Sequence, residues 1–189
     1  MVHSLSMGTG REDLLERVMA DVAHHGIGGR SLRQIAEAVG SSHRMLLYHF
    51  GSREGLVAAV VAEVEAQQRG ALAEAARTAP AGADLEDVTL ALWHRVASEE
   101  LRPFVRLFFE ALATAEPTVE GRDLTAAWLD QSESVGRLLG VDVDDVELRL
   151  AVAVVRGLLV DVVATGEVGP ATESLRRFLD LWRAGSPVA

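Results

Sequence analysis

Residues 31–56 have the sequence SLRQIAEAVGSSHRMLLYHFGSREGL, which decides the expected fold. A first helix is predicted to begin at Ser31, which has the spacing of a capping box with Gln34, and to end at Gly40. A second helical pattern follows at about residues 42–50, with Ser41 or Ser42 as its cap. Two short helices joined by a glycine-containing turn predict a helix-turn-helix unit.

The charges of the chain are unevenly divided. The net charge is -10, yet residues 1–56 contain six arginines and six acidic residues, so the excess acid lies in residues 57–189. No acidic residue stands between Val39 and Arg53. Because phosphate repels an acidic surface, any nucleic-acid contact is confined to the N-terminal segment.

The composition excludes several classes of protein. A hydrophobic content of 49% with 24% charged residues is typical of a globular chain. No apolar run reaches the roughly 20 residues that span a bilayer, and the N-terminus lacks the pattern of a signal peptide. Cysteine is absent, which excludes disulfides and thiolate metal ligands. We therefore expect a cytoplasmic protein with no membrane partner.

Signals for catalysis are missing from the sequence. It contains no Ser/His/Asp arrangement, phosphate-binding loop or cluster with metal-ligand spacing, and His24 and His25 adjoin a helix end that they are expected to cap. We expect no enzyme activity, no metal site and no cofactor.

The remaining sequence has helical periodicity almost throughout, so the predicted fold class is all-α with about nine helices. The expected division is a helix-turn-helix domain at residues 1–56 and a larger helical domain at residues 57–189. The other helices are predicted at about residues 9–25, 52–77, 84–98, 103–115, 121–139, 145–165 and 171–184.

The second short helix has the side chains that a DNA-reading helix needs. His43 and Arg44 lie in its first turn, which is nearest the base edges in a helix-turn-helix complex. Arginine suits the paired acceptors of guanine. Tyr48, His49 and Arg53 follow at positions from which they reach phosphates. The alternative is a plain helical hairpin whose polar residues only face water.

The segment GRSLRQIAEAVGSSHRMLLYHFGSREGLVAAVV, residues 29–61, resembles the DNA-binding half of the TetR family of bacterial transcriptional regulators. The resemblance rests on the motifs S-L-x-x-I-A, L-x-Y-H-F and x-S-[KR]-E-x-L and covers about residues 9–60. It implies base contacts for His43 and Arg44, close approach to the DNA backbone for Ser41 and Ser42, and phosphate contacts for the other four residues of the set. The full set is Ser31, Ser41, Ser42, His43, Arg44, Tyr48, His49 and Arg53.

Two positions depart from the family pattern. Met45 stands where the family usually has a small polar residue, and Leu47 stands where it usually has a tyrosine that grips the DNA backbone. Tyr48 is expected to compensate for the second change.

The resemblance also implies a helical body that holds a small, often apolar ligand. Pockets of this kind have apolar walls and a few polar anchors. The candidates are Trp93, His94, Phe104, Phe108, Trp128 and Arg156. The alternative interpretation is that the aromatic residues form plain core, that His94 lies at the surface and that Arg156 pairs across a dimer interface.

The last two helices are the candidate dimer surface. Leu175, Phe178, Leu179 and Trp182 form an apolar stripe at helical spacing, and Gly157 permits close helix approach. Alternatively, the stripe covers the chain's own core. With the resemblance, we expect a homodimer that binds a pseudo-palindromic double-stranded DNA operator.

The sequence thus predicts a transcriptional regulator, expected to be a repressor that a small, largely apolar molecule releases from its operator. A second hypothesis is a helical ligand-binding or scaffold protein whose DNA-binding surface has decayed, for which Leu47 is the main argument.

Overall fold

The computed structural model of the 189-residue chain describes residues 10–80, 83–114, 119–139 and 144–185. Within these ranges the protein is all-α, with nine helices and no strand, which confirms the predicted fold class. The helices are α1 (Gly10–His25), α2 (Leu32–Ala38), α3 (His43–Phe50), α4 (Arg53–Thr78), α5 (Leu85–Val96), α6 (Arg102–Thr114), α7 (Val119–Leu139), α8 (Asp145–Thr165) and α9 (Gly169–Gly185).

Local side-chain caps explain where the short helices begin. Ser31 Oγ accepts from the Gln34 backbone N–H at 3.3 Å, and Gln34 Oε1 accepts from the Ser31 N–H at 2.8 Å, so the predicted capping box is confirmed. Ser42 caps α3 and Ser52 caps α4, each by accepting a hydrogen bond from the backbone N–H three residues later. The cap expected at Thr9 lies outside the described residues.

The turn between α2 and α3 depends on one glycine. Gly40 has a φ of 64°, in the left-handed region that glycine adopts without steric cost. The next amide, Ser41 N–H, donates to Ala36 O at 2.8 Å, which satisfies a carbonyl at the end of α2. The chain therefore reverses sharply enough to place α3 across α2.

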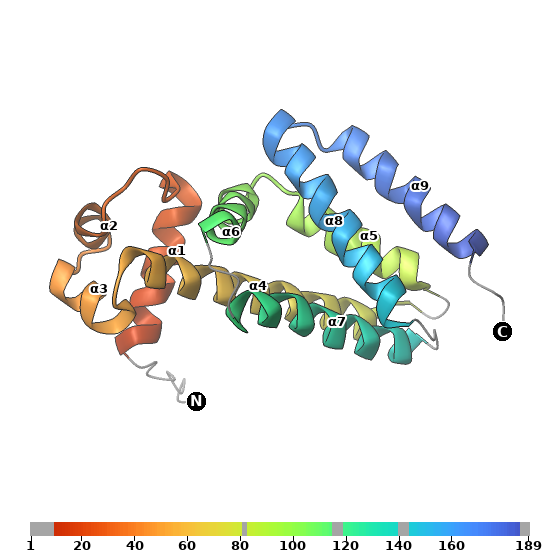
Figure 1. Cartoon of the computed structure of the whole chain (residues 1–189), viewed down its shortest axis with the longest axis horizontal. Helices are drawn as coiled ribbons and strands as arrows, with labels where there is room; N and C mark the ends of the chain where they lie inside the picture. Colours follow the sequence, from red (N-terminus) through yellow and green to blue (C-terminus); the bar gives the residue numbers. More distant parts are fainter. Residues whose placement is uncertain (1–9, 81–82, 115–118, 140–143, 186–189) are drawn as a thin grey trace, which may run out of the picture.

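The helices form a head and a body (Figure 1). We call α1–α3 the head and α5 with α7–α9 the body. The long α4 begins in the head and runs along the body, and α6 lies between the two parts. The expected domain division at residues 56 and 57 falls inside α4, and it remains a prediction.

One apolar core joins the head to α4 and α6. It contains Val18 and Ile35 of the head and Leu56 and Val60 of α4, together with Leu107 of α6. Two further clusters hold the body together, one between α5, α8 and α9 and one between α4, α5 and α7. Helices α4 and α6 contribute to the head core and also reach the body, so packed side chains connect the two parts.

The joint between α3 and α4 is tight. A Cβ atom at Gly55 would lie 2.1 Å from the carbonyl oxygen of Phe50, closer than any side chain tolerates. The first turn of α4 therefore packs directly against the end of α3.

Among the helices in the described part of the chain, none has the length and apolarity to cross a membrane.

Candidate DNA-binding and ligand-binding sites

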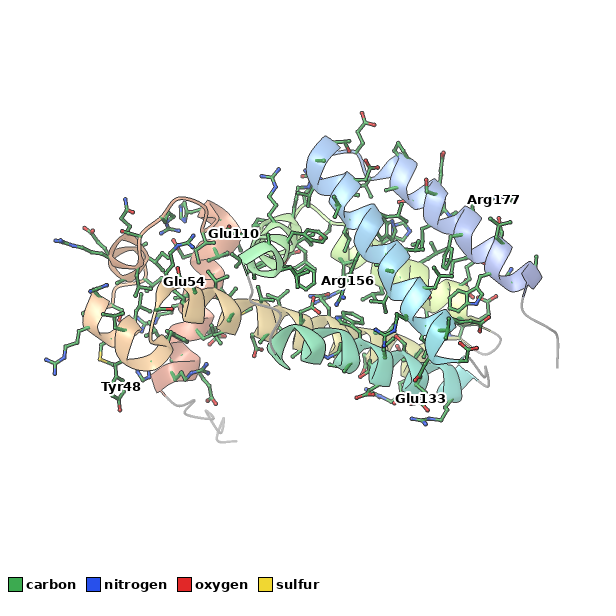
Figure 2. All side chains as sticks on the ribbon, viewed as in Figure 1. Tyr48, Glu54, Glu110, Glu133, Arg156 and Arg177 are labelled. Carbon is green, nitrogen blue, oxygen red and sulfur yellow. The ribbon has the colours of Figure 1, made fainter. Side chains whose placement is uncertain are left out.

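Helix α3 has one buried side and one exposed side. Leu46 and Phe50 point inward and are 0% and 8% exposed. The opposite side is open to solvent and carries Arg44 and Tyr48, and Tyr48 is 79% exposed. Figure 2 shows Tyr48 projecting outward from α3 at the end of the head. The structure therefore places these two predicted contact residues together on the outer face of α3.

The other predicted DNA contacts surround this face. His43 and Ser42 are exposed at the start of α3, Ser31 is exposed at the start of α2, and Ser41 is half-buried in the turn. His49 is half-buried and packs edge-on against the Tyr48 ring, with 4.9 Å between ring centroids. No acidic residue lies on α3, so its charge suits a polyanion.

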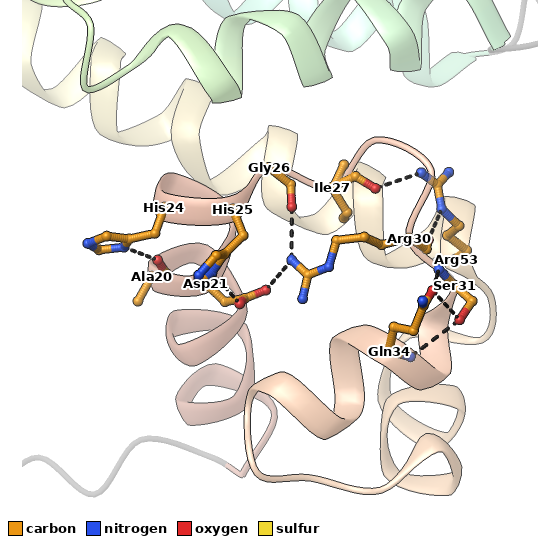
Figure 3. A network of polar contacts seen from close by, with 10 residues as sticks. All are labelled: Ala20, Asp21, His24, His25, Gly26, Ile27, Arg30, Ser31, Gln34 and Arg53. Atoms are coloured by element: carbon orange, nitrogen blue, oxygen red, sulfur yellow. Dashed lines mark hydrogen bonds and ion pairs between the residues drawn. The ribbon is translucent and has the colours of Figure 1, made fainter.

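Arg53 makes contacts within the protein (Figure 3). Its Nε donates to Arg30 O at 3.0 Å, and its Nη2 donates to Ile27 O at 3.2 Å and to Glu110 Oε1 at 3.3 Å. The guanidinium thus ties the start of α4 to the α1–α2 loop and to α6. A phosphate contact by Arg53 remains a prediction, and the observed geometry gives this residue a positioning role in the head.

A second arginine braces the same loop (Figure 3). Arg30 Nη1 lies 2.6 Å from Asp21 Oδ2 and donates to Gly26 O at 2.9 Å. His25 Nδ1 also lies 3.0 Å from Asp21 Oδ1, and His24 Nδ1 lies 2.8 Å from Ala20 O. Both histidine rings thus hydrogen-bond to groups one helical turn earlier in α1. Across the described residues, no group of histidine and acidic side chains has the arrangement to hold a metal ion.

The body contains a cavity of about 150 Å³ between α4 and the helices α5–α9. Four of the six predicted ligand residues line it: Phe104, Phe108, Trp128 and Arg156. A dry cavity of about this volume accommodates a molecule the size of benzene. The walls are mostly aliphatic and aromatic, as small-molecule sites require.

A few polar side chains interrupt the apolar wall. The Trp128 indole N–H donates to the Glu65 carboxylate, and the Arg156 guanidinium lies 5.2 Å from the centroid of the Phe108 ring. Gln68 is buried, and its side-chain oxygen accepts from Arg95 Nε at 2.9 Å. In Figure 2, Arg156 lies in the middle of the body between α4 and α8.

Burial changes the pKa values of Glu65 and Arg156. It raises the pKa of Glu65 above its usual range, and the hydrogen bond from Trp128 and the positive charge of Arg156 oppose the change. Burial also lowers the pKa of Arg156, and the Glu65 charge opposes that change. The cavity therefore combines an apolar wall with a carboxyl group and a guanidinium that are costly to keep charged.

Two predicted ligand residues do not line the cavity. Trp93 is 1% exposed and packs between α5 and α9, where its indole N–H donates to Thr172 Oγ1 at 2.7 Å. His94, the next residue, faces solvent. Sequence reasoning missed Glu65 and Gln68, although both occupy inward positions of α4 in register with Val61 and Leu72. The sequence contained a signal for both residues, because each is polar and stands at a position of α4 where the helical periodicity predicts an apolar side chain.

The predicted dimer stripe of α9 faces the chain's own body. Leu175 and Leu179 are 0% and 5% exposed in the core with Trp93, and Phe178 and Trp182 are half-buried against the same core and line the cavity. The alternative interpretation, that this stripe covers the chain's own core, therefore describes its packing.

A different apolar stripe remains exposed, and it lies on α8. Val146, Leu150 and Val160 are 75%, 54% and 50% exposed, and the predicted Gly157 lies on the same exposed side. Their spacing of three, four or seven residues places them on one face of the helix. The sequence contained a signal for this exposed stripe. Helix α8 is apolar on nearly all sides, and a single chain cannot bury every side of a surface helix.

The head and the body together define a class of protein: a helix-turn-helix DNA-binding unit attached to a helical body with a small internal cavity. Residues 19–60 match the profile of the family described as "Bacterial regulatory proteins, tetR family". The HTH-type transcriptional repressor AcnR of Corynebacterium glutamicum is 27% identical over 181 residues, which cover 90% of this chain and 89% of that protein.

Solved structures share the fold. A transcriptional regulator from Rhodococcus sp. Rha1 aligns with a TM-score of 0.72 and 19% identity, over 96% of this chain and all of that one. The multidrug binding protein EbrR, complexed with imidazole, aligns with a TM-score of 0.62 and 21% identity, over 94% of this chain and 96% of that one. At these identities the likeness concerns the fold.

The family profile and AcnR agree in indicating a TetR-family transcriptional regulator with a DNA-binding domain. Both are described as regulatory proteins.

Proposed function

We propose that the protein is a homodimeric repressor that binds a pseudo-palindromic operator through α3 and leaves it when a small, largely apolar molecule enters the body cavity. The observation that carries the proposal is the outer face of α3, where Arg44 and Tyr48 project from a helix without acidic residues. The repressor role is supported by the resemblance to AcnR, which is a transcriptional repressor.

Base reading is assigned to the first turn of α3. Ser42 caps this turn by accepting from the Met45 N–H at 3.2 Å, so the backbone beneath His43 and Arg44 is fixed before DNA arrives. Arg44 has the donor geometry for guanine, and Tyr48, one turn later, reaches a phosphate with its hydroxyl group.

Ligand control is assigned to the cavity because of the helices that form it. Phe104 and Phe108 of α6 line the cavity and also belong to the head core. Glu65 and Gln68 of α4 line it on a helix that begins against α3. A molecule in the cavity therefore contacts both elements that join the body to the head. It releases DNA only if it binds the DNA-free form more tightly than the operator-bound form.

Dimerisation is assigned to the exposed stripe of α8, which includes the predicted Gly157. The residues are Val146, Leu150, Gly157 and Val160. Leu181 of α9 is also 56% exposed, and α9 lies beside α8 (Figure 1). A twofold contact on this side buries the stripe and leaves both heads free to reach half-sites about one DNA turn apart, ~34 Å.

Selection of binding sites from a random duplex pool tests the DNA proposal. We expect an enriched sequence with two inverted half-sites. Arg44→Ala should weaken binding to it by about five- to 150-fold and relax the base preference at one position of each half-site. Arg137→Ala is the matched control, because Arg137 is exposed near the end of α7, outside both α3 and the exposed stripe of α8.

The decayed-surface hypothesis makes the opposite prediction. It predicts no enriched sequence at all, or only weak binding that disappears with salt and is unaffected by Arg44→Ala. The ligand proposal is tested separately by screening apolar molecules of about benzene size and repeating each hit with operator present. A hit with equal affinity in both conditions is not an inducer, because it shifts no equilibrium.

A further inference from the structure

We propose that Met45 reads a thymine in each half-site of the operator, by contact between its side chain and the C5 methyl group of the base. The inference rests on the proposed binding of DNA by α3 and adds a position-specific preference to it.

The structure places Met45 where such a contact is made. It is the third residue of α3, directly after Arg44, and its side of the helix is turned away from the buried Leu46 and Phe50. Its backbone N–H donates to Ser42 Oγ at 3.2 Å and to Ser42 O at 3.0 Å, so the first turn is fixed by its cap. The residue is 43% exposed, so its side chain is available for contact with a partner.

The chemistry of the side chain restricts its partner on DNA. A thioether donates no hydrogen bond and is only a weak acceptor, so Met45 binds neither phosphates nor the polar edges of bases. The thymine C5 methyl is the apolar group that the major groove presents. Contact between the two removes apolar surface of both from water, and the flexible methionine chain adapts to the shape of the groove.

DNA is favoured over a protein partner for this surface by its charge. Arg44 precedes Met45, His43 and His49 lie on the same short helix, and the helix has no acidic residue. A purely apolar docking face would not be bordered in this way, whereas an acid-free border that carries an arginine complements the phosphates beside a groove.

Leu47 offers an internal comparison. It is also exposed, at 39%, but it lies two residues further along α3, about 200° around the helix from Met45. The two side chains therefore point to different sides of α3, and a base contacted by one is out of reach of the other. Leu47→Ala is a matched control for Met45→Ala.

The experiment uses the full-length protein and the operator obtained by selection. Each thymine of one half-site is replaced in turn by uracil, which lacks only the C5 methyl, and the dissociation constant is measured by fluorescence anisotropy. We expect one thymine at which this replacement weakens wild-type binding roughly fourfold, the loss that corresponds to one buried methyl group. Met45→Ala should bind the thymine and uracil duplexes equally, and Leu47→Ala should still discriminate between them.

A second measurement needs no variant. At the sensitive position, a cytosine·guanine pair is compared with a 5-methylcytosine·guanine pair, which restores the methyl group in the groove. Wild-type protein should prefer the methylated pair by a similar factor. The inference is overturned if no thymine is sensitive to loss of its methyl, or if Met45→Ala, shown by circular dichroism to be folded, discriminates as well as wild type. If selection enriches no sequence, the proposed DNA function itself fails, and this inference fails with it.

Discussion

The substitution Val160→Glu is expected to separate the dimer into folded monomers. Val160 is 50% exposed on α8, so about half of its burial energy remains available to a partner, roughly 1 kcal/mol. A glutamate in its place leaves a charge without a partner in the interface, at a cost of about 3–5 kcal/mol. Together, about 4–6 kcal/mol weakens the dimer by roughly a thousandfold or more, even if only one of the two symmetric copies is counted.

Two matched substitutions isolate the cause of the effect. Leu179→Glu introduces the same charge at a side chain that is 5% exposed in the protomer's own core, and it should unfold the protein. Leu112→Glu introduces it at an exposed leucine of α6, away from the α8 stripe, and should change neither fold nor assembly. Only Val160→Glu should keep helical content while losing the dimer.

Sedimentation equilibrium over a range of micromolar concentrations measures the mass, and circular dichroism measures the fold. Wild-type protein should sediment as a dimer, and the Val160→Glu variant as a monomer that binds the operator much more weakly. A wild-type monomer at tens of micromolar, or a Val160→Glu dimer as tight as wild type, would show that the exposed stripe of α8 is not the interface.

Two further predictions concern the cavity. Glu65→Gln keeps an acceptor for the Trp128 indole N–H and removes a carboxyl whose pKa is raised by burial. Wild-type protein should therefore lose stability relative to the variant as pH rises from about 4.5 through the raised pKa. Urea unfolding of both proteins at a series of pH values measures the difference in stability, and a difference that does not change with pH would contradict the prediction. The sign follows because the folded state binds the proton more tightly than the unfolded state, so raising the pH favours unfolding. Ala151→Phe places a ring in a cavity of about 150 Å³ and should abolish the response to any inducer while operator binding is retained. Ala126→Phe, on the exposed side of α7, is the control. Operator release measures the response, and an unchanged response in Ala151→Phe would place the ligand elsewhere.

Local structure was predictable from the sequence because its causes are local. The caps at Ser31, Ser42 and Ser52 each bind an amide three residues away, and the left-handed Gly40 acts on the adjacent peptide. The apolar periodicity of the helices is equally short-range. The all-α fold and the helix-turn-helix unit followed from these signals, and with them the exposed face of α3.

The contacts of Arg53 and Trp93 depended on residues far away in the chain. Arg53 bonds to carbonyl groups 23 and 26 residues before it and to Glu110, 57 residues after it. Trp93 donates to Thr172, 79 residues further on, which places it in a helix contact and not at the cavity. No periodic pattern specifies such pairs, because they result from how the helices cross.

The sequence by itself determined the helices, the caps at Ser31, Ser42 and Ser52, the turn that orients α3 and the absence of acid from α3. Only the tertiary structure decided which apolar stripe each of the last two helices buries. Leu175 and Leu179 of α9 are four residues apart, as are Val146 and Leu150 of α8, yet the first pair is in the chain's own core and the second is exposed. Spacing shows that a helix has an apolar face, but the neighbours that cover this face are set by the packing of the whole chain.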